Sequence, residues 1–141
     1  MADPLHHPGY PKTAACACGA LTVSVAAPPV KIHACSCLDC QRRTGSAFSC
    51  TAFFADVAAV VNGEFKSFRR IADSGRVNDA SFCPACGCAV FSRLEGLPDV
   101  IGVTVGCFAD PAFEKPGTLY WTVRRHQWLA PPAGAATVER Q

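Results

Sequence analysis

The sequence is poor in charge and has no long apolar run. Charged residues make up 17% of the 141-residue chain, and 13 Lys and Arg against 11 Asp and Glu leave a net charge of +2. This balance is unlike that of proteins that bind nucleic-acid phosphates, so we expect no nucleic-acid partner. The apolar run at 55–61 is interrupted by Asp56 and followed by Asn62-Gly63. Since roughly 20 apolar residues are needed to cross a bilayer, we expect no membrane association.

The beginning of the chain lacks the pattern of a secretory signal. Residues 1–12 contain three prolines and no basic segment followed by an apolar stretch, which indicates a cytoplasmic protein. Thiols stay reduced in that compartment. The 10 cysteines are therefore better explained as metal ligands or catalytic groups than as disulfides.

Short β-favouring segments separated by turns predict a mainly β fold with antiparallel sheets. The expected strands lie at 21–25, 30–34, 46–54, 76–82, 88–94, 100–105 and 118–128. Only 38–44 is expected to form a helical turn or two. A length of 141 residues and a hydrophobic content of 50% suit one domain with a substantial core. We place this domain at 13–129, with an N-terminal extension at 1–12 and a flexible Pro- and Ala-rich tail at 130–141.

Two cysteine pairs have the spacing of a structural zinc site. The motifs CACG at 16–19 and CPACG at 83–87 both end in glycine, which lets the backbone fold around a metal. The four thiolates would come from Cys16, Cys18, Cys83 and Cys86. The alternative is that these residues are buried thiols or a disulfide pair. A metal held by both pairs would close a long loop and stabilise the domain.

A third cysteine motif, CSCLDC at 35–40, offers three ligands at short range. Three protein ligands with an open fourth position are typical of catalytic zinc, which makes Cys35, Cys37 and Cys40 the candidate reaction centre. Three thiolates favour thiol chemistry over water activation. Two alternatives stay open: Cys50, Cys88 or Cys107 completes a closed structural site, or the chain holds one four-ligand metal and the remaining cysteines are buried.

The three motifs together resemble the glutathione-dependent formaldehyde-activating enzymes, which share a domain with centromere protein V. The similarity is carried by CACG at 16–19, CSCLDCQRRTGSAF at 35–48 and FCPACGCAVF at 82–91, and it extends from about 15 to 128. The resemblance implies a β-tent fold with two zinc ions: a structural one at the two glycine-terminated pairs, and a catalytic one at Cys35, Cys37 and Cys40. It also implies a carbon-sulfur lyase that joins glutathione reversibly to formaldehyde.

Other residues near these motifs have candidate roles. Arg42 and Arg43 follow Cys40 and would hold a carboxylate of glutathione, although solvated surface arginines are an equal alternative. His33 lies close enough to Cys35 to support the cluster or to act as a spare ligand. Tyr120 stands where the family usually has a histidine, and His126 is displaced from that position.

The sequence therefore favours a zinc-dependent enzyme that acts on a small thiol and a small aldehyde. The alternative is a zinc-stabilised binding module in which the cysteines only build the fold. A third hypothesis, redox sensing by the pair at 83–86, leaves the matching pair at 16–18 unexplained.

Overall fold

The computed structural model describes residues 6–72 and 75–141. Within these ranges the chain forms eleven strands, one α-helix and three 3-10 helices, so the predicted mainly β fold is confirmed. The strands are β1 (Lys12–Ala15), β2 (Thr22–Val25), β3 (Lys31–Cys35), β4 (Ser49–Ala55), β5 (Ala59–Asn62), β6 (Lys66–Ile71), β7 (Val77–Phe82), β8 (Ala89–Leu94), β9 (Val100–Thr104), β10 (Thr118–Tyr120) and β11 (Ala136–Val138). The helices are α1 (Leu38–Thr44), η1 (Asp56–Ala58), η2 (Val105–Phe108) and η3 (Thr122–Arg124).

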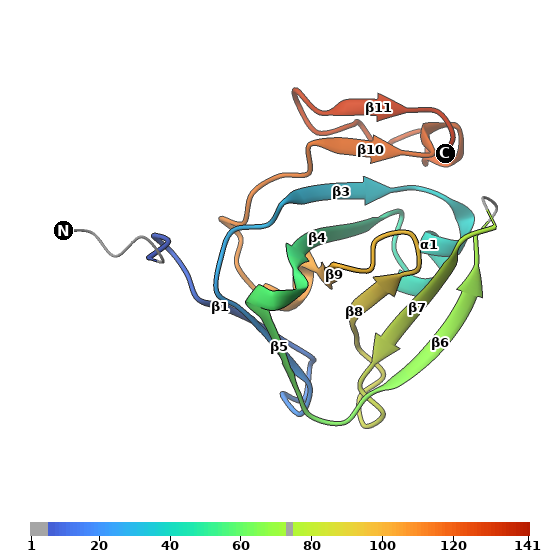
Figure 1. Cartoon of the computed structure of the whole chain (residues 1–141). Helices are drawn as coiled ribbons and strands as arrows, with labels where there is room; N and C mark the ends of the chain where they lie inside the picture. The colour runs from blue at the N-terminus through green and yellow to red at the C-terminus, as the bar shows by residue number, and fades with distance from the viewer. Residues whose placement is uncertain (1–5, 73–74) are drawn as a thin grey trace.

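The strands form two sheets. A small sheet has the order β1-β2-β5, and a large sheet has the order β11-β10-β3-β4-β9-β8-β7-β6. Figure 1 shows the large sheet curving from β11 round to β6. Its neighbours pair antiparallel, as predicted, except that β10 runs parallel to both β3 and β11. The long connection from β9 to β10 makes the parallel pairing with β3 feasible.

The core lies between the two sheets. Val23 and Val25 of β2 are fully buried, whereas the alternate residues Thr22 and Ser24 are only partly buried, which is the pattern that predicted this strand. The large sheet contributes other buried apolar residues to the same cluster, among them Ile32, Ala52, Phe54, Ile101 and Val103. This burial holds the small sheet against one face of the large one.

The opposite face of the large sheet carries polar and small residues. His33 of β3 pairs with Thr51 of β4, and Gly102 of β9 pairs with Ser92 of β8. Farther along the sheet, Asn78 of β7 pairs with Arg70 of β6. Cross-strand partners lie on one face of a sheet, so this face combines these hydrogen-bonding groups with apolar side chains such as Phe53, which pairs with Gly102.

The expected strand at 118–128 is wrong beyond Tyr120. Trp121 adopts a left-handed backbone with φ of 59°, and the chain continues into η3. A left-handed residue cannot continue a strand.

The C-terminal segment, residues 130–141, was expected to form a flexible tail, but it contains β11 paired with β10. The division into extension, domain and tail remains a prediction.

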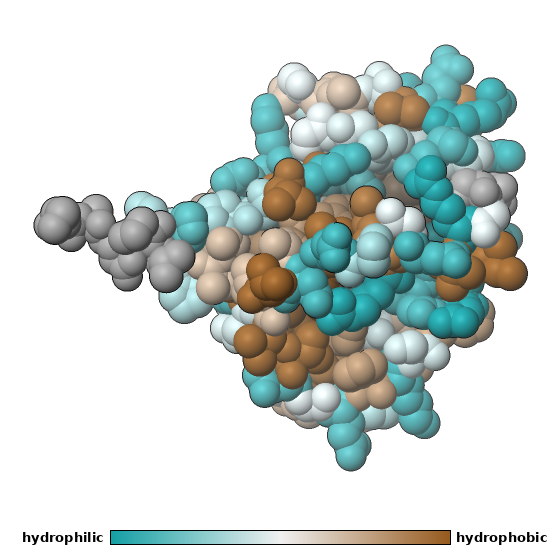
Figure 2. All heavy atoms as spheres, in the orientation of Figure 1, coloured by the Kyte–Doolittle hydropathy of each residue, from teal (hydrophilic) through white to brown (hydrophobic). Residues whose placement is uncertain are grey.

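The surface visible in Figure 2 is largely hydrophilic or intermediate, with separate hydrophobic patches. Exposed apolar side chains include Val57, Phe68 and Trp128. In the part of the chain that the structure describes, no helix is long and apolar enough to span a membrane.

Candidate metal centres and cavity

Cys16, Cys18, Cys83 and Cys86 come together in one group, the four-cysteine cluster, whose sulfur atoms all lie within 4.8 Å of one another. The Sγ atoms of Cys16 and Cys18 are 3.6 Å apart, and those of Cys18 and Cys83 are 3.7 Å apart. Tetrahedral zinc with Zn–S bonds of about 2.3 Å places its sulfurs about 3.8 Å apart. The four-cysteine cluster thus fits a tetrahedral metal ion.

Two tight turns build the four-cysteine cluster. Gly19 and Gly87 adopt φ of 80° and 76°, and their N–H groups donate to the carbonyls of Cys16 and Cys83 at 3.0 and 2.8 Å. Glycine adopts this left-handed backbone without steric cost. The N–H of Leu21 donates to Cys16 Sγ at 3.2 Å, and this bond chiefly lowers the pKa of Cys16 to about 6. The two turns therefore direct sulfur atoms and N–H groups toward the centre of the four-cysteine cluster.

Cys35, Cys37 and Cys40 form a second group, the three-cysteine cluster, with sulfur atoms within 4.8 Å of one another. Cys35 ends β3, Cys37 caps the N-terminus of α1, and Cys40 lies in its first turn. The N–H of Cys40 donates to Cys37 Sγ at 3.3 Å. Helix α1 then ends at Gly45, whose φ of 65° is a common helix stop. The bend from strand to helix thus brings the three sulfurs together.

Within the three-cysteine cluster, the thiolate form is favoured at Cys40 and disfavoured at Cys35. Hydrogen bonds from Cys35 and Cys37 lower the pKa of the Cys40 thiol, and the charge of Arg43 adds to the effect. Hydrogen bonds with Cys37 and Cys40 raise the pKa of Cys35. Thiolate is the form of cysteine that binds metal. Among the described residues, no fourth histidine, cysteine or carboxylate joins the cluster.

A cavity of about 270 Å³ opens beside the three-cysteine cluster. All three cysteines of that cluster line it, and none of the four-cysteine cluster does. Its sheet wall is formed by the polar face described above, including His33, Thr51, Asn78 and Ser92. Its other wall comes from α1 and η3. The two clusters therefore differ in the access that a small molecule has to them.

Four arginines line the cavity. Arg42 and Arg43, singled out from the sequence, do so from α1, and Arg124 does so from η3. The fourth, Arg70 of β6, forms an ion pair with Asp39 at 3.0 Å and has a side chain only 19% exposed. The last two were not among the candidate site residues named from the sequence. No short-range pattern marks them, because they reach the cavity through the curvature of the sheet and the turn after β10.

His33 lines the cavity but is not part of the three-cysteine cluster. Burial, aided by the charge of Lys31, lowers its pKa to about 4. Its Nδ1 atom is buried with no hydrogen-bond partner among the described residues. Tyr120 accepts a hydrogen bond from Lys31 and does not line the cavity, and His126 lies against Trp128 with ring centroids 5.5 Å apart.

The remaining cysteines lie outside both clusters. The Sγ atoms of Cys88 and Cys107 are 3.9 Å apart, and both side chains pack against the core together with Cys50. Burial raises the pKa of Cys107 to about 12. None of the three completes the three-cysteine cluster, so closure of that site by Cys50, Cys88 or Cys107 does not occur in this structure.

Comparison with known proteins agrees with this arrangement. The family model for glutathione-dependent formaldehyde-activating enzymes matches residues 11–124. A crystal structure of a Rhodobacter sphaeroides protein, a structural genomics target, aligns with a TM-score of 0.55 at 18% identity, over 89% of this chain and 98% of that one. At this identity the likeness shows the fold alone. No curated protein matches the sequence. The match over residues 11–124, which include both cysteine clusters, shows that the chain belongs to the glutathione-dependent formaldehyde-activating enzyme family.

Proposed function

We propose that the protein is a zinc-dependent carbon-sulfur lyase that joins a small thiol, glutathione being the first candidate, to a small aldehyde such as formaldehyde. The observation that carries this proposal is the three-cysteine cluster opening into an arginine-lined cavity. The reaction adds the thiol sulfur to the carbonyl carbon, and the thiol proton ends on the former carbonyl oxygen. No electrons are exchanged with a further reactant, and the reverse reaction releases both substrates.

In this proposal Cys35, Cys37 and Cys40 are the metal ligands of the reaction centre. Zinc, when bound there, would stabilise the substrate sulfur as thiolate and act as a Lewis acid. The chain's own contribution is to leave one side of the cluster facing the cavity. Holding two reactants in one small cavity also removes much of the entropic cost of bringing them together.

The cavity walls match the chemistry of glutathione. Its two carboxylates suit guanidinium groups, which bind carboxylates through paired hydrogen bonds. Arg42 and Arg43 line the cavity on the helix side and are our candidates for this role. The peptide amides of glutathione would face the neutral polar groups of Thr51, Ser92 and Asn78 on the sheet side.

Cys16, Cys18, Cys83 and Cys86 have a different role in the proposal. We assign them a structural zinc, because they lie away from the cavity and join segments that are distant in the sequence. Two zinc ions per chain are therefore expected. Elemental analysis of protein purified without chelator tests this number directly, and a single zinc ion would contradict it.

Exchange NMR with ¹³C-formaldehyde and glutathione tests the activity. An active protein increases the exchange rate between free and glutathione-bound formaldehyde above the rate measured without protein. Cys37→Ser is expected to lower this increase by about 10-fold or more, whereas Cys88→Ser, outside both clusters, should retain it. Protein that carries two zinc ions and gives no increase would support the non-catalytic binding module instead.

A further inference from the structure

Arg70 reaches the three-cysteine cluster from the far edge of the large sheet. Its strand, β6, lies at the opposite end of the strand order from β10 and β11. Figure 1 shows that the sheet curves enough to bring the end of β6 beside α1. There the Nη1 atom of Arg70 lies 3.0 Å from Oδ2 of Asp39, one of the two residues between Cys37 and Cys40 in the first turn of the helix.

The Arg70 guanidinium is close enough to sense the charge of the cluster. Arg70 lines the same cavity as Cys35, Cys37 and Cys40, and its side chain is only 19% exposed. Arg43 lines the same cavity from α1. The cluster is therefore surrounded by positive charge on more than one side.

Positive charge near the three-cysteine cluster can offset the negative charge that a metal-bound cluster would carry. Three thiolates around a divalent cation carry a net charge of about −1, and an additional substrate thiolate would raise it to about −2. A partly buried cation nearby offsets such charge more effectively than an exposed one, because water screens it less. Asp39 holds the guanidinium in place.

We propose that Arg70, oriented by Asp39, is a positioning residue that favours an anionic substrate sulfur at the three-cysteine cluster. This inference rests on the proposed function, because it assumes a metal at Cys35, Cys37 and Cys40. It differs from the role given to Arg42 and Arg43, since Arg70 acts on the sulfur and not on a distant carboxylate.

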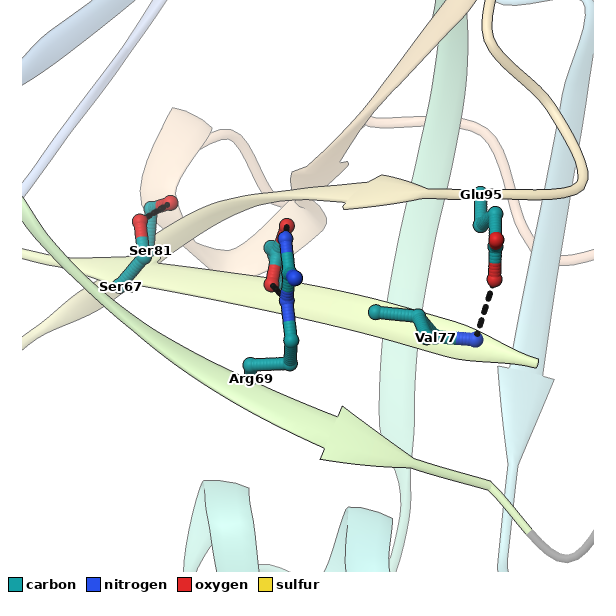
Figure 3. A network of polar contacts seen from close by, with 6 residues as sticks. Ser67, Arg69, Val77, Ser81 and Glu95 are labelled. Atoms are coloured by element: carbon teal, nitrogen blue, oxygen red, sulfur yellow. Dashed lines mark hydrogen bonds and ion pairs between the residues drawn. The ribbon is translucent and has the colours of Figure 1, made fainter. Parts of the chain in front are cut away.

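The neighbouring Arg69 is a matched control. It lies on the opposite face of β6, and its side chain is 71% exposed. Its Nε and Nη2 atoms donate to the two carboxylate oxygens of Asp79 at 2.9 and 3.0 Å (Figure 3). Arg69→Gln removes the same charge from the same strand without touching the cavity.

The test is thiol binding by the full chain loaded with cobalt, whose charge-transfer absorption reports sulfur ligation. Two thiols are titrated: 2-mercaptoethanol, which is neutral apart from its thiol, and 3-mercaptopropionate, which adds a carboxylate. Arg70→Gln should weaken the binding of both by about 10-fold, as expected for losing one nearby charge in a partly screened site. Arg69→Gln should stay within about 2-fold of the wild type, and Arg70→Lys should retain most of the binding because it keeps the charge.

Three results would overturn the inference. Unchanged binding of 2-mercaptoethanol by Arg70→Gln would show that its charge does not act on the sulfur, and weakening of 3-mercaptopropionate alone would make Arg70 a carboxylate ligand. A 10-fold loss in Arg70→Lys would show that charge is not the cause, and this variant decides the matter if Arg70→Gln does not fold. A wild-type spectrum that no thiol alters would instead refute the proposed function, and the inference with it.

Discussion

Removing the metal from the four-cysteine cluster should destabilise the protein more than removing it from the three-cysteine cluster. The four-cysteine cluster joins the turn before β2 to the turn between β7 and β8, and Figure 1 shows these turns at the same end of the molecule. Cys18 and Cys83 are 65 positions apart in sequence. The three-cysteine cluster, by contrast, lies within one short segment, Cys35 to Cys40.

The difference in loop length sets the magnitude. Treated as a cross-link, a closed loop of 65 residues restricts the unfolded chain by about 4 kcal/mol. A loop of about 6 residues restricts it by only about 2 kcal/mol. Small domains have a total stability of about 5–15 kcal/mol. Loss of the cross-link that closes the 65-residue loop therefore removes a large share of the free energy of unfolding.

Urea denaturation of two double variants measures this difference. Cys83→Ser/Cys86→Ser should lose about 2 kcal/mol more stability than Cys37→Ser/Cys40→Ser, and elemental analysis should show that each has lost one metal. The wild type treated with a strong chelator should resemble the first variant. Equal losses of unfolding free energy in the two variants would refute this prediction. So would a wild-type urea midpoint that does not change when the chelator is added.

Three further predictions concern single residues. Gly63→Ala should cost about 3 kcal/mol or more, because φ is +102° and the new Cβ would lie 2.0 Å from the carbonyl oxygen of Ala20; a urea midpoint within error of the wild type would contradict this. Gly102→Ala should cost about 1–2 kcal/mol of stability and narrow the cavity, because its Cβ would lie 2.9 Å from Ser92 Oγ and 2.9 Å from a Thr51 methyl. Urea denaturation measures the loss of stability, and thiol titration measures the effect on binding. Unchanged values in both assays would show that Ser92 and Thr51 move aside to accommodate the methyl group. The bond from Lys12 lowers the pKa of Asp110 below 3.8, so this carboxylate stabilises the fold above that pH and loses its effect as the pH falls below it. Asp110→Asn should therefore narrow the stability gap between pH 7 and pH 3, measured against the wild type, and an unchanged gap would exclude a contribution from this ion pair.

The cysteine clusters could be anticipated because their geometry is local. A pair of cysteines followed by Gly19 or Gly87 contains both the ligands and the turn that aims them. Only the meeting of the two pairs is a long-range event, and the metal chemistry of four thiolates makes it a reasonable expectation. The alternation of buried residues in β2 likewise depends on neighbouring positions alone.

The walls of the cavity could not be anticipated in the same way. Thr51, Ser92 and Asn78 lie on three different strands, and no pattern near any one of them in the sequence marks the sheet face that they share. Arg70 is separated from Asp39 by a chain segment that includes two other strands, and only the curvature of the sheet unites them. The left-handed backbone of Trp121 carries no signal either, since aromatic residues favour strands.

The parallel pairing of β10 with β3 also lay beyond the sequence pattern. Antiparallel neighbours follow from short turns, but β10 is reached from η2 through a segment without strands or helices. Which edge such a segment joins depends on the side chains already displayed by β3. Leu119, the buried residue of β10, lies opposite Ala34 of β3 and supplies that match.

The ion pair between β6 and α1 has a consequence for the order of assembly. Cys35, Cys37 and Cys40 are neighbours in the chain, so they can capture a metal as soon as that segment has been synthesised. Arg70 can join them only after β7, β8 and β9, which follow it in the chain, have connected β6 to β4 in the curved sheet. A newly made chain would thus be able to bind a metal there before Arg70 reaches the cluster, and the contribution of Arg70 would be gained late in folding.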